Sequence, residues 1–127
     1  MKVVLDTNVL ISGIFFSGPP SEILKSWRKG YIQLTLSPEI VDEYVRVVRI
    51  LADDFPDIEI SSILTLILTN SELVQVSPFP VQVCEDQDDD KFLACALAGK
   101  CSVIISGDKH LLKLYCFVNF KMVYSIH

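Results

Sequence analysis

Short apolar runs alternate along the chain with longer segments in which apolar residues recur every three or four positions. The runs are rich in β-branched residues, which is typical of buried strands, and they lie at 3–5, 31–36 and 101–105. Helical spacing predicts helices at 22–29, 38–51, 60–69 and 91–98. Residues 73–79 and 116–126 are predicted to be extended, and 109–114 to form one or two helical turns. Strands that alternate with helices predict an α/β protein whose parallel sheet is covered on both faces.

The helix that begins at Pro38 carries the clearest pattern. Ser37 is a predicted N-cap, and a proline suits the first helical position. One wide face of this helix is apolar and comprises Ile40, Val41, Tyr44, Val45, Val47, Val48 and Leu51. Glu43 falls on the border of that face. Such a position is neither core nor fully solvated, and it suits a carboxylate at the rim of a cleft.

Composition places the chain among folded proteins without a membrane span. Its 127 residues are enough for one domain, predicted to cover 1–127, and half of them are hydrophobic, with a mean hydropathy of +0.42. The apolar stretches are far shorter than the roughly 20 residues that a membrane helix needs. Asp6 and Asn8 interrupt the apolar start, which argues against an export signal. The four cysteines show no metal-ligand spacing, which predicts reduced thiols in a cytoplasmic protein.

The net charge of −5 lacks the basic footprint that nucleic-acid binders usually carry. If nucleic acid is the partner, metal ions or local basic residues must offset the acidic ones. The candidates for contacts along a nucleic-acid backbone are Lys25, Arg28, Lys29, Arg46 and Arg49. The alternative interpretation, solvated positions on helix faces, remains open for all five.

Four carboxylates stand where they can converge. Asp6 directly follows the first predicted strand, and Asp108 follows the strand at 101–105. Because ligands bind outside the carboxyl ends of parallel strands, both belong at the same edge of the sheet. Asp90 opens a helix that is apolar almost all round, and Glu43 borders its own helix. Clustered carboxylates repel one another unless they are neutralised, and Mg²⁺ or Mn²⁺ is the simplest neutralising partner because both prefer oxygen ligands.

Each of these residues also has a structural interpretation. Asp90 can serve as a favourable charge at a helix N-terminus, Asp108 as a turn residue, and Glu43 as an ordinary surface residue. Asp6 is the hardest to explain as a helix cap. Its neighbours Thr7 and Asn8 are either turn formers or partners of metal-bound water, and the sequence does not decide between these roles.

Four stretches, in this order, resemble the PIN-domain family. They are Val3-Val4-Leu5-Asp6-Thr7-Asn8-Val9, Ser37-Pro38-Glu39-Ile40-Val41-Asp42-Glu43-Tyr44, Asp88-Asp89-Asp90-Lys91-Phe92-Leu93-Ala94-Cys95-Ala96 and Val103-Ile104-Ile105-Ser106-Gly107-Asp108-Lys109-His110-Leu111-Leu112. Each motif alone is weak, whereas the four in register within one small domain are specific. The resemblance extends to about Leu114, after which the closing segment usual in the family is absent.

The resemblance implies a three-layer α/β/α sandwich and a Mg²⁺- or Mn²⁺-dependent ribonuclease. It places the catalytic acids at Asp6, Glu43, Asp90 and Asp108, with Asp6, Asp90 and Asp108 as metal ligands. Thr7, Asn8 and Ser106 would be supporting polar groups. Many small members resemble VapC-type toxins of toxin–antitoxin pairs, which implies an RNA substrate, a homodimer and a small antitoxin partner.

Two other functions compete with this one. Asp6 at a strand end could act as an aspartyl nucleophile in phosphoryl transfer, although Asn8 stands where haloacid-dehalogenase-like phosphatases want a second aspartate. The chain could also be a catalytically degenerate PIN fold that binds RNA or protein without cutting. All four acids are present, which argues against a lost site.

Overall fold

The computed structural model describes residues 2–76, 90–101, 103–106 and 121–124. In chain order the elements are β1 (Lys2–Leu5), α1 (Thr7–Phe15), α2 (Pro19–Arg28), β2 (Gln33–Leu36), α3 (Pro38–Ala52), α4 (Ile60–Thr69), β3 (Glu72–Leu73), α5 (Asp90–Ala98), β4 (Val103–Ser106) and β5 (Lys121–Tyr124). Its described strands form a five-stranded sheet in the order β3-β2-β1-β4-β5, and every pairing is parallel. The predicted α/β class is therefore confirmed.

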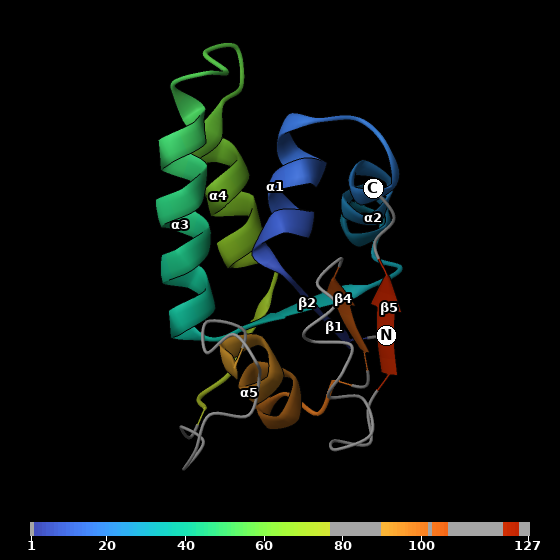
Figure 1. Cartoon of the computed structure of the whole chain (residues 1–127). Coiled ribbons are helices and arrows are strands. Elements are labelled where there is room, and N and C mark those ends of the chain that lie inside the picture. The colour runs from blue at the N-terminus through green and yellow to red at the C-terminus, as the bar shows by residue number, and fades with distance from the viewer. Residues whose placement is uncertain (1, 77–89, 102, 107–120, 125–127) are drawn as a thin grey trace.

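The connections place helices on both faces of the sheet. Helices α1 to α4 belong to the crossovers that run from β1 through β2 to β3, whereas α5 returns from β3 to β4 on the other side of β1. Because such crossovers are right-handed, the reversal in direction moves α5 to the opposite face. Figure 1 shows this arrangement, with α1 and α2 on one side of the sheet and α5 on the other. The predicted three-layer α/β/α sandwich is thus observed.

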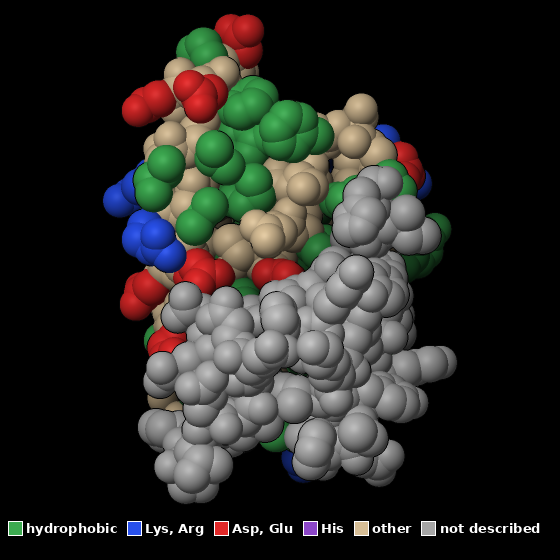
Figure 2. Space-filling view, viewed as in Figure 1, with side chains coloured by type: hydrophobic (Ala, Val, Ile, Leu, Met, Phe, Trp, Pro, Cys, Tyr) green, Lys and Arg blue, Asp and Glu red, His purple; other side chains and the backbone are tan. Residues whose placement is uncertain are grey.

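The core is continuous across the central strand. Val3, Val4 and Leu5 of β1 are fully buried, and they pack with the buried residues of β2, β4 and α5. A second apolar cluster joins α1, α3 and α4 around Phe15 and Val48. Figure 2 shows apolar side chains over this region, while basic side chains occupy the outer side of α3. The wide apolar face predicted for α3 is confirmed, since Ile40, Tyr44 and Val48 are buried.

Several boundaries differ from the prediction. Helix α1 was not expected, and α2 starts at Pro19 rather than at residue 22. Strand β2 begins at Gln33 because the preceding residues form the turn out of α2, where Tyr31 is 72% exposed. Strand β4 extends through Ser106, and α5 is buried as predicted except near its end, where Leu97 is exposed. The helical turns predicted at 109–114 lie outside the described residues.

The remaining expectations on composition are tested in part. Cys95 and Cys101 are free, buried thiols, as predicted, whereas Cys84 and Cys116 lie outside the described residues. Within the described ranges, no helix is both long and apolar enough to cross a membrane. Part of the extended segment predicted at 116–126 is β5, which pairs with β4 beyond the point where the sequence departs from the family pattern.

Candidate active site

Asp6 lies at the carboxyl edge of the sheet, directly after β1. Its backbone N–H donates to the carbonyl of Ile105, at 3.1 Å, because β1 and β4 end side by side. Its carbonyl accepts from Val9 and Leu10, so Asp6 holds the N-cap position of α1. The side chain makes no capping hydrogen bond, and the residue is only 6% exposed. The carboxylate is therefore held at the edge of the sheet rather than used to begin the helix.

Ser106 binds the Asp6 carboxylate. As the last residue of β4, it lies fully buried beside the end of β1, and its Oγ donates to Asp6 Oδ2 at 2.8 Å. A hydrogen bond to the charged form of a carboxylate favours that form. Ser106 thus helps to keep a buried negative charge at this position.

Glu43 joins three helices. It lies in the second turn of α3, where its carboxylate accepts a hydrogen bond from the Thr7 hydroxyl of α1. The other oxygen forms an ion pair with Lys91 Nζ of α5 at 2.5 Å. The side chains of Glu43 and Lys91 are 15% and 16% exposed, so the pair is shielded from most of the solvent. The positive charge of Lys91 balances the negative charge of Glu43, which a half-buried carboxylate requires.

Tyr44 fixes α3 against the strand that carries Asp6. Its buried hydroxyl donates to the carbonyl of Leu5. Burial raises the pKa of Tyr44 well above its ordinary value, and the nearby acidic groups of Asp6, Cys95 and Glu43 raise it further. The phenol therefore stays protonated and remains a donor. This contact sets the position of Glu43, one residue earlier, relative to Asp6.

The structure brings four of the predicted site residues into direct contact as two linked pairs. Asp6 binds Ser106, while Thr7, the residue after Asp6, binds Glu43. Asn8 is exposed in the first turn of α1, and its side chain has no hydrogen bond among the described residues.

The structure gives less information on the two other predicted acids, Asp90 and Asp108. The backbone of Asp90 begins α5, which agrees with the predicted start of this helix. The ion pair of Lys91 with Glu43 attaches this end of α5 to α3, so the chain at Asp90 enters the same region. Asp108 lies outside the described residues, two positions after the end of β4.

Lys91 and Tyr44 contact the site but were not predicted as parts of it. Lys91 carried a signal, because a cation in the first turn of a helix opposes the helix dipole and favours an acidic partner. Tyr44 carried none beyond its place next to Glu43, since an aromatic residue on an apolar helix face is ordinary core.

The donor set suits a hard divalent cation. The described site contains two carboxylates and two hydroxyls, and oxygen donors of this kind are the ligands that Mg²⁺ and Mn²⁺ take. A grouping of three or more acidic, histidine or cysteine side chains that could hold a metal is not found among the described residues. The fit therefore rests on Asp6 and Glu43 together with the hydroxyls beside them.

Comparison with known proteins identifies the family. The PIN domain model matches residues 2–110, so the chain belongs to the PIN domain family. The chain is also similar to the uncharacterized protein MJ1680 of Methanocaldococcus jannaschii, with 31% identity over 134 positions that cover 100% of this chain and 83% of that protein. PIN domains are generally nucleases that use divalent metals, which supports a hydrolase function here.

Proposed function

We propose that the protein is a Mg²⁺- or Mn²⁺-dependent endoribonuclease, and that it is the toxin of a type II toxin–antitoxin pair. The observation that carries the nuclease proposal is the buried carboxylate of Asp6 at the carboxyl edge of the sheet, with Glu43 attached to the next residue. Parallel sheets bind their ligands at this edge. The family supports the same chemistry.

The proposal assigns roles to the four acids. Asp6, Asp90 and Asp108 are metal ligands, and Glu43 orients the attacking water or holds a second ion. A bound divalent ion supplies positive charge to the phosphate and makes water more acidic. In the reaction, a water oxygen attacks phosphorus and gives up a proton, the bond between phosphorus and the leaving ribose oxygen breaks, and that oxygen takes up a proton.

The remaining polar groups hold this arrangement. Ser106 keeps the Asp6 carboxylate oriented through its 2.8 Å hydrogen bond. Thr7 and Lys91 hold the two oxygens of Glu43, which fixes the direction of its free lone pairs. Such preorganisation is what a hydrolytic site needs, because the charges then require little reorganisation during the reaction.

The test compares the native protein with Asp6→Asn on a mixed set of labelled RNAs. Each is incubated with Mg²⁺, with Mn²⁺ and with EDTA. We expect cleavage that requires both the metal and Asp6, while circular dichroism and thermal unfolding show that the variant is folded. Full cleavage by the folded variant, or cleavage that persists in EDTA, contradicts the mechanism. A folded native protein that neither cuts RNA nor binds metal would instead be the degenerate binding module.

The toxin role rests on the resemblance to small VapC-type proteins and has its own test. Expression of the native protein in a bacterial host should arrest growth, and expression of Asp6→Asn should not. Growth that is equal for both refutes the toxin role and leaves the nuclease proposal intact. We also propose that the protein is a homodimer and is inhibited by a small antitoxin, which light scattering and co-expression with a neighbouring short reading frame can test.

A further inference from the structure

A pocket lies at the edge of the sheet opposite to Asp6. Its volume is about 680 Å³, and its walls come from the end of α2, the turn into β2 and the end of α4. Gln33, which lines it, opens β2 and pairs with Lys2 at the start of β1. Asp6 follows the other end of that strand, and four residues of a strand span roughly 13 Å. The pocket is therefore separate from the candidate active site.

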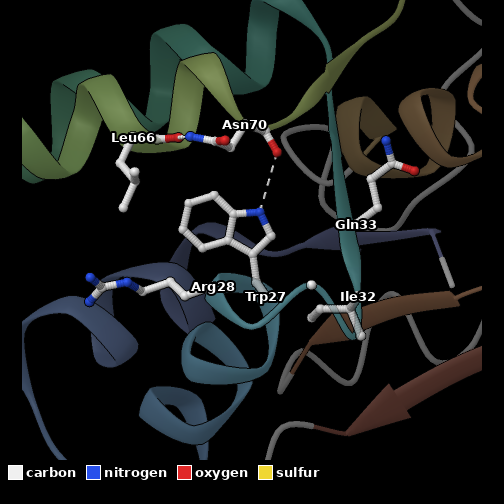
Figure 3. Close-up of a pocket in the computed structure, with 7 residues that line it drawn as sticks. Trp27, Arg28, Ile32, Gln33, Leu66 and Asn70 are labelled. Carbon is white, nitrogen blue, oxygen red and sulfur yellow. Dashed lines mark hydrogen bonds between the residues drawn. The ribbon is translucent and has the colours of Figure 1, made fainter.

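Trp27 is the central side chain of this pocket. Its indole Nε1 donates to the backbone carbonyl of Asn70 at 3.4 Å, which fixes the ring between α2 and α4. Figure 3 shows the indole in the middle of the lining residues, with Leu66 and Asn70 on one side, Arg28 beside it and Gln33 opposite Arg28. Trp27 is only 8% exposed and packs in the main apolar cluster, so only a small part of the ring reaches the pocket, and a base can lie against that fixed apolar part.

Arg28 gives the pocket a positive charge. It is exposed at the end of α2 and makes no ion pair with any described residue. The described residues that line the pocket include no acidic side chain. Its neighbour in the turn, Lys29, adds a second exposed cation. In a chain with a net charge of −5, an unpaired guanidinium beside an indole favours an anionic ligand, and phosphate matches its planar set of donors.

Two amides complete the chemistry. The Asn70 Nδ2 group donates to the carbonyl of Leu66 at 2.9 Å and to Thr69 Oγ1 at 3.1 Å. The side-chain oxygen of Asn70 and the side-chain amide of Gln33 have no hydrogen bond within the described part of the chain. Gln33 therefore offers donors and an acceptor, and Asn70 offers an acceptor, and proteins use such groups to bind the edge of a nucleobase.

We propose that this pocket binds one nucleotide, with its base against the Trp27 ring and its phosphate at the Arg28 guanidinium. The volume lies within the range of about 300–1,000 Å³ that is usual for small-ligand sites. The nucleotide can be a free mononucleotide or one unit of a single-stranded RNA, since both present the same base and phosphate. The binding does not depend on the proposed cleavage reaction, because Asp6 lies at the other edge of the sheet.

The experiment uses the full chain in EDTA, so that the acidic site holds no metal. Uridine and adenosine 5′-monophosphates and a short single-stranded RNA are titrated by equilibrium dialysis. Trp27 is the one tryptophan of the chain, so a change in tryptophan fluorescence on binding reports on this pocket. We expect the nucleotides to change the fluorescence, and inorganic phosphate or the free nucleoside to bind more weakly.

The decisive variant is Arg28→Gln, with Lys100→Gln as the control, because Lys100 is an exposed cation that does not line the pocket. Loss of a charge-assisted contact should weaken nucleotide binding by about tenfold or more, whereas the control should leave it unchanged. Because Arg28 is exposed, its substitution should not affect folding, which urea unfolding verifies.

Absence of binding up to millimolar nucleotide, or equal binding by Arg28→Gln and the native protein, refutes the proposal. Binding of the mononucleotides alone identifies the free nucleotide as the ligand, whereas tighter binding of the RNA identifies a contact for an RNA strand. Asp6→Asn should bind like the native protein, so a failed cleavage assay and a failed binding assay remain distinguishable.

Discussion

At the residue scale, the balance of charge around Glu43 decides how the candidate site is held. One carboxylate oxygen accepts from Thr7 and the other pairs with Lys91, and both members of the ion pair are largely buried. Removal of one partner from such a pair is unfavourable because the remaining charge stays desolvated. The site is therefore stabilised by a cation that comes from a different helix.

Lys91→Met should destabilise the fold. It removes the ammonium group and leaves Glu43 with the Thr7 hydroxyl, so we expect a loss of about 1–3 kcal/mol, between the values for exposed and fully buried pairs. Urea unfolding at neutral pH measures the loss. Arg46→Met on the same helix as Glu43 is the control, since Arg46 is exposed and should lose little. Equal stabilities for the two variants would mean that the ion pair contributes nothing.

Ser106→Ala tests the hydrogen bond that Ser106 donates to the Asp6 carboxylate. The variant removes a donor at 2.8 Å from a carboxylate that is 6% exposed. The free energy of unfolding should fall by about 1–3 kcal/mol, because a buried charged acceptor loses part of its hydrogen bonding. Ser61→Ala, at an exposed position of α4, provides the baseline. If Asp6→Asn is introduced first, the effect of Ser106→Ala should shrink, and a double-mutant cycle measures this coupling.

Cys95 should make the protein less stable in alkali. Burial, with a smaller effect of Cys101, raises the pKa of Cys95 from 9.0 to about 12. Below pH 9 the thiol is protonated in both the folded and the unfolded protein, so its ionisation does not reduce the free energy of unfolding. Between pH 9 and about 12 the unfolded chain releases the proton and the folded chain keeps it, so stability falls as the pH rises.

Unfolding free energies at pH 8 and pH 11 measure this effect. We expect the native protein to lose about 2–3 kcal/mol more than Cys95→Ala over this interval. The variant is the appropriate reference because it keeps every other ionisable group of the chain. Parallel pH profiles would show that Cys95 does not ionise differently in the two states.

At the scale of elements, α1 shows where sequence patterns stop being informative. The segment from Thr7 to Phe15 contains polar residues in its first turn, a glycine, and β-branched residues of low helix propensity. It becomes a helix because Val9, Leu10 and Phe15 are buried against the sheet and neighbouring helices. Tertiary packing therefore overrides local preference here, and a single sequence does not display that packing.

The longer elements were predictable for the opposite reason. The apolar face of α3 and the buried run of β1 each repeat a regular period that matches one buried surface. The candidate site likewise has one part that the sequence could predict and one part that it could not. The position of Asp6 after a strand was readable locally, whereas the contacts of Glu43 with Thr7 and Lys91 join residues 36 and 48 positions apart. Local patterns do not specify such pairs.

Gly13→Ala tests the packing of α1 against α2. A Cβ added at Gly13 would lie 2.8 Å from the Pro20 carbonyl oxygen and 2.6 Å from Leu24 Cδ1. Alanine raises helix propensity by about 1 kcal/mol, but the Pro20 carbonyl belongs to the backbone and cannot move aside easily. We expect a net destabilisation of about 1–3 kcal/mol from overpacking, measured by urea unfolding. Ser12→Ala, one position earlier in the same helix, should not be destabilised in this way, and a more stable Gly13→Ala would mean that the two helices separate readily.

At the scale of the whole molecule, the charge of the chain opposes the substrate that we propose. A protein with a net charge of −5 repels a polyanion at long range. Two local features reduce this repulsion. The end of α2 presents exposed cations around Trp27, and the carboxyl edge of the sheet presents oxygen donors that suit a divalent cation. The two features lie at opposite edges, so an RNA that contacts both has to cross the molecule.

A divalent cation should therefore stabilise the folded protein whether or not RNA is present. An ion that binds only the folded state adds about 2.7 kcal/mol at a concentration one hundred times its dissociation constant. We expect Mn²⁺ to raise the midpoint of thermal unfolding of the native protein with the logarithm of its concentration above the dissociation constant, and EDTA to reverse the rise. Asp6→Asn should lose most of this response, while Asp57→Asn, at an exposed position far along the chain from the site, should keep it. Equal responses of the two variants would mean that the ion screens the net charge instead of occupying a site, and sodium chloride at matched ionic strength would then produce the same rise.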